Sequence, residues 1–327
     1  MNFFLIITFF SIILITSFIF LLLSLRKNNL HHNQGSDLIS NSDETSSPQD
    51  VGSFYNTYTD DFLKVYGNVI QAYRTVNTDD LLKYESDSMG LTKGLRLLDA
   101  GCGVGGPAMY FAKKFDLHID GITISSEQVK IANENIQSGD LTDHVSIQHG
   151  DYHKLEDIVD LNSYDVVYFL ESLGHSNDHS LALGSAFKVL KPGGKLYVKD
   201  LFQKIPAIES HKSFIDEEVK KINDAYHYNI MKLESILTSL RQIGFIISFV
   251  KTIDIPLDKF ENLTISNDFQ ELTGIGKIDN WDSYIFPVDF FEILCIKPEY
   301  DIEKGNKRYF LQNLYQMQVN NWKKSQL

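Results

Sequence analysis

The sequence predicts an α/β protein whose doubly wound, mostly parallel sheet of seven strands is preceded by one transmembrane helix. Three observations support this fold class. From residue 95 onward, short apolar segments alternate with helical patterns, which is typical of strands and helices around a parallel sheet. A glycine-rich turn, 101–106, follows the first apolar segment. An uncharged run from Phe3 to Leu25 has the length of a membrane span, which needs about 20 apolar residues.

The first 52 residues are expected to form an anchor, 1–27, and a disordered polar linker, 28–52. A cleaved signal peptide is the alternative. It is disfavoured because no Lys or Arg precedes the apolar run and no A-x-A pattern follows it. Arg26 and Lys27 follow the run, so the positive-inside rule places the rest of the chain in the cytoplasm. We therefore expect a single-pass membrane protein with a cytoplasmic globular domain, 53–327.

Five strands and their connecting helices are expected between residues 95 and 198. Pro107 suits the first turn of the helix that follows the glycine-rich turn, and Ser125 is the expected N-cap of the next helix, 127–137. Another helix is expected at 181–190, before the turn 192–194. The expected strands are 95–100, 117–124, 145–148, 165–170 and 195–198.

The C-terminal part supplies two further strands, 244–253 and 291–296, after a stretch of helical character, 214–240. Between these strands lies an insertion, roughly 256–287, that is rich in aromatic residues. Trp281, Tyr284 and Phe286 are candidates for lining an acceptor pocket, with core packing as the alternative. Residues 299–327 are expected to form a terminal helix.

Composition excludes several classes of function. The 327 residues carry a formal net charge of -13, and a chain this acidic is a poor general nucleic-acid binder. The two cysteines, Cys102 and Cys295, form neither a CxxC pair nor a disulfide framework. We therefore expect no nucleic-acid partner and no metal site, and the sequence leaves the oligomeric state open.

The glycine-rich turn predicts a site for a nucleotide-like ligand at the carboxyl ends of the strands. Gly101, Gly103 and Gly106 satisfy the dinucleotide pattern GxGxxG, so NAD is one candidate. Asp99 argues against it, because a carboxylate beside the first glycine would repel a pyrophosphate. S-adenosylmethionine (SAM) carries an ammonium and a sulfonium group and no phosphate, so it suits Asp99 better.

Four segments together resemble class I SAM-dependent methyltransferases, in particular the sterol C-methyltransferase and cyclopropane-fatty-acid-synthase-like branch. The resemblance covers roughly residues 54–254. The segments are Leu98-Asp99-Ala100-Gly101-Cys102-Gly103-Val104-Gly105-Gly106-Pro107-Ala108, Gly121-Ile122-Thr123-Ile124-Ser125 followed by Gln128, Tyr168-Phe169-Leu170-Glu171-Ser172-Leu173-Gly174-His175, and Leu190-Lys191-Pro192-Gly193-Gly194.

This resemblance implies a set of cofactor contacts. Asp99 would face the methionine end of SAM, Gln128 would lie near the ribose or adenosine, and Asp151 would accept from the adenine amino group. Many members carry Asp or Glu where this chain has Thr123, and Asp120 is out of register by three positions. The expected cofactor-binding residues are Asp99, Gly101, Cys102, Gly103, Gly105, Thr123, Gln128, Asp151 and Tyr152.

Glu171, His175 and Tyr168 are the expected catalytic residues. With an alkene acceptor, they would stabilise the carbocation or relay the departing proton; with an amine or hydroxyl, Glu171 or His175 would act as base. The alternatives are a structural ion pair for Glu171 and a turn-capping role for His175.

The sequence thus predicts a SAM-dependent methyltransferase that acts on a small apolar acceptor, such as a sterol, isoprenoid or lipid, most simply by carbon methylation. Three alternatives stay open: N- or O-methylation of a polar metabolite or lipid headgroup, a non-catalytic membrane scaffold, and an NAD-linked oxidoreductase.

Overall fold

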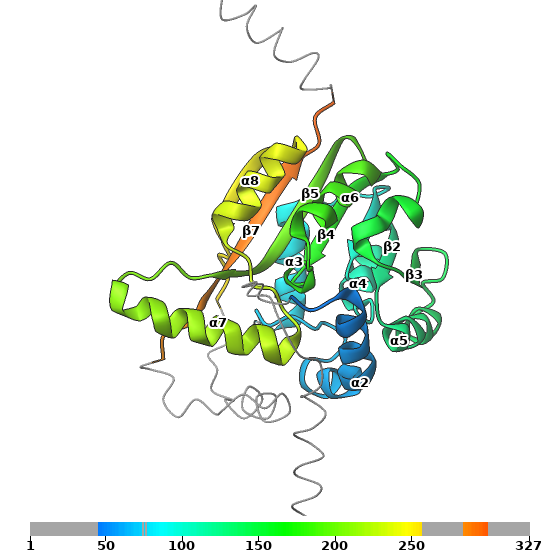
Figure 1. Cartoon of the computed structure of the whole chain (residues 1–327). Coiled ribbons are helices and arrows are strands. Elements are labelled where there is room, and N and C mark those ends of the chain that lie inside the picture. The colour runs from blue at the N-terminus through cyan, green and yellow to red at the C-terminus, as the bar shows by residue number, and fades with distance from the viewer. Residues whose placement is uncertain (1–44, 74, 76, 257–283, 300–327) are drawn as a thin grey trace, which may run out of the picture. The chain divides into compact units, whose positions relative to one another are not determined.

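A seven-stranded sheet lies at the centre of the residues that the computed structural model describes, 45–73, 75, 77–256 and 284–299 (Figure 1). The strand order is β3-β2-β1-β4-β5-β7-β6. All neighbours are parallel except β7, which is antiparallel to both β5 and β6. The expected doubly wound, mostly parallel sheet is confirmed.

The strands agree closely with the expected segments. They are β1 (Arg96–Ala100), β2 (His118–Thr123), β3 (Val145–His149), β4 (Tyr164–Leu170), β5 (Leu190–Gln203), β6 (Ile246–Thr252) and β7 (Val288–Ile296). The fifth strand is longer than expected because β7 pairs with it along its whole second part, from Lys195 opposite Ile296 to Gln203 opposite Val288.

Helices cover both faces of the sheet. They are α2 (Pro48–Tyr66), α3 (Thr78–Met89), α4 (Gly106–Phe115), α5 (Ser126–Ser138), α6 (His179–Val189), α7 (Lys212–Tyr226) and α8 (Leu233–Ile243), with short 3-10 turns η1 (Tyr152–Asp157), η2 (Leu173–His175) and η3 (Glu209–His211). The expected Ser125 cap is present, since its side chain accepts from the backbone N–H of Gln128.

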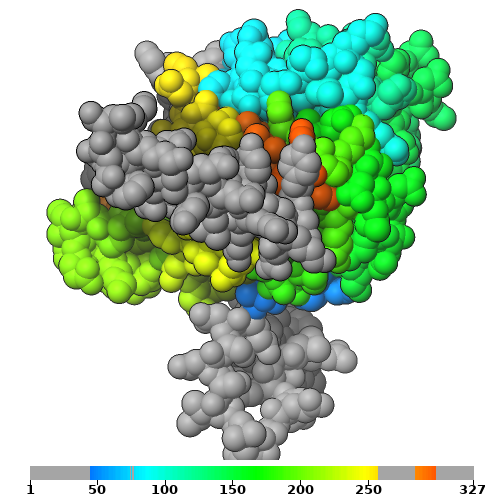
Figure 2. All heavy atoms as spheres, turned by 90° about the horizontal axis from the view of Figure 1, so that it is seen from above, coloured from blue at the N-terminus to red at the C-terminus, as the bar shows by residue number. Residues whose placement is uncertain are grey.

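Alternation along the strands divides the core into two layers. Val166, Tyr168 and Leu170 of β4 pack in the layer formed with α3, α4 and α5. Val167 and Phe169 pack in the opposite layer, with α6 and α8. A strand buried on both faces must be apolar throughout, as β4 is after its first two residues. Figure 2 shows α7, in yellow-green, on the flank opposite the green surface of α5 and β3.

The helical stretch expected at 214–240 is two helices. The backbone leaves α7 at His227, which has a left-handed φ of 52°, and α8 starts at Leu233. Of the expected linker 28–52, residues 48–52 form the start of α2, where Ser47 and Asp50 make a capping box. The rest of the linker and the expected helix 299–327 lie largely outside the described residues.

The expectation of a single-pass membrane protein is wrong on the evidence of the described residues, in which no helix is long and apolar enough to cross a membrane. Even α2, with 19 residues, carries Asp50, Asp60, Asp61 and Lys64 and packs as an amphipathic helix. Phe3 to Leu25, on which the expectation rested, lies outside the described residues.

Candidate active site

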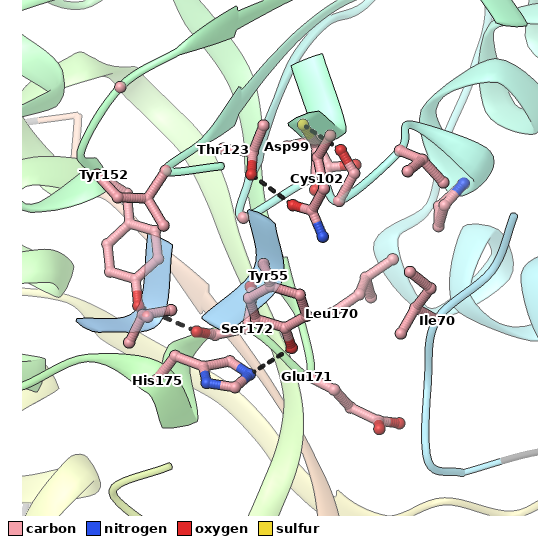
Figure 3. A pocket seen from close by; sticks show the side chains of 18 of the residues that line it. Tyr55, Ile70, Asp99, Cys102, Thr123, Tyr152, Leu170, Glu171, Ser172 and His175 are labelled. Atoms are coloured by element: carbon pink, nitrogen blue, oxygen red, sulfur yellow. Dashed lines mark hydrogen bonds between the residues drawn. The ribbon is translucent and has the colours of Figure 1, made fainter. Parts of the chain in front are cut away.

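A cavity opens at the carboxyl ends of β1, β2 and β4, where the strand order reverses between β1 and β4 (Figure 3). Its empty volume is about 850 Å³, part of it open to solvent. This is within the usual range for small-molecule and cofactor sites. The position is also where open α/β sheets bind their ligands.

The glycine-rich turn lets the backbone form the floor of this cavity. Gly101 and Gly103 line it with positive φ angles of 89° and 54°. A Cβ on Gly101 would lie 2.4 Å from Cβ of Ser172, so a side chain here would collide with the end of β4. Cys102 also lines the cavity, and burial raises the pKa of its thiol well above the usual range, which makes it a poor nucleophile.

Gly105 does not line the cavity, contrary to expectation. It is the N-cap of α4, with a φ of 79°, and a Cβ would approach the Ile147 side chain to 2.5 Å. Its role is to let the chain turn into α4 against β3.

Asp99 lies at the end of β1, lines the cavity and is only 2% exposed. Burial raises the pKa of this carboxyl to about 8, which the Tyr168 hydroxyl partly offsets. Within the described part of the chain, neither Asp99 Oδ2 nor the Tyr168 hydroxyl has a hydrogen-bond partner. An unpartnered, buried carboxylate oxygen at the cavity wall fits a cationic ligand group.

Tyr168 is not a cavity residue, so the expected catalytic role loses its geometric basis. It is fully buried, and its ring packs edge-on against Phe111 at 5.9 Å. Leu170, on the same face of β4, does line the cavity at the end of the strand, whereas Tyr168 lies two residues further from that end, within the core layer beneath α4.

Thr123 and Gln128 form one polar unit at the end of β2. The Thr123 hydroxyl donates to Gln128 Oε1 at 2.6 Å, and both side chains are buried (Figure 3). Because the amide oxygen is thus occupied, the Gln128 NH₂ group is left as the donor at the cavity, which both residues line.

Asp151 and Tyr152 close the side of the cavity next to η1. Asp151 Oδ1 accepts from the backbone N–H and from Nδ1 of His153, at 2.9 and 2.6 Å. Burial would raise the pKa of Asp151, but the bonds to His153 outweigh it and lower the pKa. The Tyr152 hydroxyl donates to the Ser172 carbonyl at 3.1 Å. Asp151 is therefore ionised and oriented as an acceptor.

Glu171 lines the cavity, yet its carboxylate is already engaged. Oε2 accepts from the backbone N–H of Ala72 at 2.5 Å, Oε1 accepts from that of Tyr73 at 3.2 Å, and Lys199 Nζ lies 2.5 Å from Oε1. These contacts favour the alternative reading, a structural ion pair, over the expected role as a base.

His175 lines the cavity and contacts Tyr55, a residue of α2 that sequence reasoning did not single out. The Tyr55 hydroxyl lies 2.8 Å from His175 Nε2, and Nδ1 lies 3.1 Å from the His227 carbonyl oxygen. A carbonyl can only accept, so Nδ1 carries the proton and Nε2 accepts from Tyr55. Burial lowers the pKa of His175 to about 4, so the imidazole is neutral.

The aromatic candidates of the insertion are not placed at this cavity. Tyr284 donates to Glu218 at 2.8 Å and packs against Phe214 and Phe286. Neither Tyr284 nor Phe286 is among the cavity's lining residues, and Trp281 lies outside the described residues.

A doubly wound sheet, a glycine floor and a buried carboxylate at the end of β1 define a Rossmann-like SAM-binding fold. Comparison with known proteins agrees. Residues 52–258 match the family model described as mycolic acid cyclopropane synthetase, and the chain belongs to that family. It is a SAM-dependent methyltransferase.

Individual relatives differ in their acceptors. The chain is 33% identical over 161 residues to the 27-O-demethylrifamycin SV methyltransferase of Amycolatopsis mediterranei, covering 47% of this chain and 58% of the relative. It is 34% identical over 111 residues to the sterol 24-C-methyltransferase erg6 of Aspergillus fumigatus, covering 34% and 29%. The chain thus spans less than two thirds of either relative. The crystal structure of the [4+2]-cyclase SpnF superposes with a TM-score of 0.65, at 22% identity over 78% of this chain and 97% of that one.

Proposed function

We propose that this methyltransferase methylates a hydroxyl oxygen of a small, largely apolar acceptor, and that His175 receives the hydroxyl proton through Tyr55. The hydrogen bond between Tyr55 and His175 at the cavity wall is the observation that carries this proposal. Oxygen methylation needs a proton acceptor beside the reacting hydroxyl, and this pair offers a neutral, oriented imidazole at the cavity wall.

The cavity suits SAM on the chemistry of its walls. Asp99 offers an unpartnered carboxylate oxygen to the ammonium, Gly101 and Gly103 offer bare backbone, and Gln128 offers an amide donor. When bound, SAM supplies a methyl group that its sulfonium already makes electrophilic. The chain's own task is therefore to orient the acceptor, exclude water and take up one proton.

The proton path follows from the hydrogen bonds. The acceptor hydroxyl donates to the Tyr55 oxygen, and the Tyr55 proton moves to His175 Nε2 as the oxygen–methyl bond forms and the methyl–sulfur bond breaks. The His227 carbonyl holds Nδ1–H, so the imidazole keeps the tautomer that can accept. The resulting imidazolium returns its proton to solvent after the ether product leaves. Because burial disfavours a charged His175, taking up the proton is the unfavourable part of this step and returning it to solvent is the favourable part.

The apolar character of the acceptor is proposed from the lining residues. Part of the cavity wall consists of aliphatic side chains, which offer packing and few hydrogen bonds. These residues are Pro48, Val51, Ile70, Val104, Pro107, Ile124 and Leu170.

Carbon methylation is the second candidate. The sterol methyltransferase relative and the apolar walls favour it. The expected stabilising carboxylate, Glu171, is however bound to Lys199 and two backbone N–H groups. It is therefore poorly placed to stabilise a carbocation or to accept a proton from one.

The methylated atom can be read directly from the product. The full chain would be incubated with SAM carrying a ¹³C-methyl group and a panel of apolar alcohols, phenols, amines and alkenes. We expect turnover with hydroxylated members and a ¹³C shift typical of an O-methyl ether. A label found only in C-methyl or N-methyl products would overturn the oxygen assignment and leave the methyltransferase class unaffected.

A further inference from the structure

The Glu171 carboxylate joins two parts of the chain that are far apart in sequence. Glu171 follows β4, whereas its backbone partners Ala72 and Tyr73 lie between α2 and α3. Three donors converge on this one carboxylate, counting Lys199 of β5. Hydrogen bonds in which one group is charged are stronger than those between neutral groups, and losing a hydrogen bond to a buried polar group is costly.

Lys199 supplies the positive charge at the centre of this arrangement. It is fully buried and also contacts Gln71 Oε1 and, at 3.3 Å, Glu85 Oε1. Burial alone would lower the pKa of Lys199, but Glu171 and Glu85 raise it above the usual value. The amine is therefore charged, and Gln71 and Glu171 are both tied to it.

Residues 68–73, here called the strap, contribute one wall of the cofactor cavity. Asn68, Ile70 and Gln71 of the strap line it. The strap also passes close to the first turn of α4, where a Cβ on Gly106 would lie 2.0 Å from the Asn68 carbonyl oxygen. The position of this wall thus depends on where the strap is held.

The backbone at Glu171 is shaped to make these contacts. Its φ is 54°, in the left-handed region that a non-glycine residue adopts at some energetic cost. In Figure 3 the Glu171 side chain extends away from Tyr152 and Asp99, on the side of the cavity where Ile70 lies. Such a conformation persists only where surrounding contacts stabilise it, and the contacts of the Glu171 carboxylate can do so.

We propose that Glu171 and Lys199 are positioning residues that hold the strap as a wall of the SAM cavity, so that the pair controls cofactor affinity and not proton transfer. The proposal rests on SAM as the cofactor and is independent of the acceptor chemistry proposed above. A base at position 171 would instead act on turnover while leaving SAM affinity unchanged.

The substitution Glu171→Gln tests this in the full chain. It leaves Lys199 in contact with Glu85 and Gln71, so the buried amine keeps two of its three side-chain partners. We expect the dissociation constant of SAM to rise by about 10-fold or more, and turnover at saturating SAM to change far less. Hydrogen exchange should become faster at the amides of Ala72 and Tyr73. Unchanged SAM affinity together with lost turnover would overturn the proposal and indicate that Glu171 acts as a base.

Glu292→Gln is the matched control. Glu292 is also a fully buried carboxylate of the sheet, bonded to Tyr84 and Tyr197 and paired with Lys251, and it does not line the cavity. We expect a loss of stability without a loss of SAM affinity. Equal losses of affinity in both variants would overturn the proposal.

The wild-type chain provides a test that no folding defect can obscure. If Glu171 holds the strap, the amides of Ala72 and Tyr73 are protected from exchange in the folded protein even without SAM. Rapid exchange of both amides in a protein whose β4 and β5 amides stay protected would overturn the proposal.

Discussion

The Tyr55 hydroxyl donates to Nε2 of His175 across 2.8 Å, although the two residues are 120 positions apart in the chain. Tyr55 belongs to α2 and His175 to η2, after β4. The same helix α2 carries Pro48 and Val51 of the cavity wall, and its Asn56 accepts from the Ser125 hydroxyl at 2.8 Å. Seating α2 on the sheet therefore also assembles the proposed proton path.

Removing the proton acceptor should affect turnover and not cofactor affinity. For His175→Gln we expect kcat to fall by about 10²–10⁴-fold, the usual contribution of a general base. Tyr55→Phe should give a smaller loss, because the His227 carbonyl would still hold His175 in the tautomer that can accept a proton. Single-turnover methyl transfer at saturating SAM measures both.

The matched control is His179→Gln. Burial lowers the pKa of His179 to about 4 as well, but this histidine does not line the cavity. It should keep nearly full kcat. Equal activity of His175→Gln and the wild type would contradict the proposed role of His175.

The low pKa of His175 predicts the acid limb of the pH profile. Since the folded protein keeps this imidazole neutral down to about pH 4, kcat should not fall near 6.5, the ordinary histidine value. The same depressed pKa contributes stability above the unfolded value, which is lost as the pH falls toward 4. A kcat profile at saturating SAM with a midpoint near 6.5 would show that another environment surrounds the active histidine.

Gly101→Ala should damage the cavity floor. The φ of 89° disfavours any side chain, and the new Cβ would meet Ser172 at 2.4 Å. We expect a loss of stability of about 1–3 kcal/mol, from overpacking and backbone strain, with weakened SAM binding. Gly184→Ala in α6 is the control, because a Cβ added there would have nothing within 4 Å and alanine favours a helix. Thermal unfolding of both variants measures this effect. A Gly101→Ala variant that is more stable than the wild type would contradict the expected collision.

Glu85 makes the stability of the ligand-free protein depend on pH. Burial raises the pKa of Glu85 to about 7, well above its unfolded value. Its contribution is fully present below about pH 4 and is lost as the pH rises through 7. Glu85→Gln should therefore flatten the fall in Tm between about pH 4.5 and 7.5, where each kcal/mol is worth about 2–4 °C. An unchanged slope in this variant would show that Glu85 is not the responsible group.

The sheet could be predicted from sequence because each strand is a short apolar run between turn residues. Asp99 and Gly101 could be expected at the cavity because they lie at the end of the first strand, and Gln128 through the resemblance to SAM-dependent methyltransferases. Tyr55 could not be predicted, because it reaches the cavity only through the docking of α2. In the sequence it is one of several tyrosines that precede the first strand, and nothing distinguishes it from the others.

Glu171 shows a different limit of prediction from sequence. A carboxylate at the end of a buried strand indicates a partner, but the sequence does not say whether the partner is a substrate or Lys199. The contacts across the fold decide this: two backbone N–H groups and one amine occupy it. The same limit applies to Tyr168, whose orientation follows from strand alternation once the layer it faces is known.

We propose that Asp99 holds the cationic end of SAM in this cavity, and calorimetric titration of SAM into the full chain tests this role most directly. With a pKa of about 8, Asp99 is mostly protonated at pH 7 in the ligand-free protein. A bound ammonium favours its ionised form, so binding should release close to one proton.

The titration would be run at pH 7 in two buffers with different ionisation enthalpies, for the wild type and Asp99→Asn. We predict that the wild-type binding enthalpy differs between the buffers, and that the variant binds about 10-fold or more weakly with no such difference. Equal affinity in the wild type and the variant, with no proton released by either, would contradict the assignment of Asp99 to the cofactor.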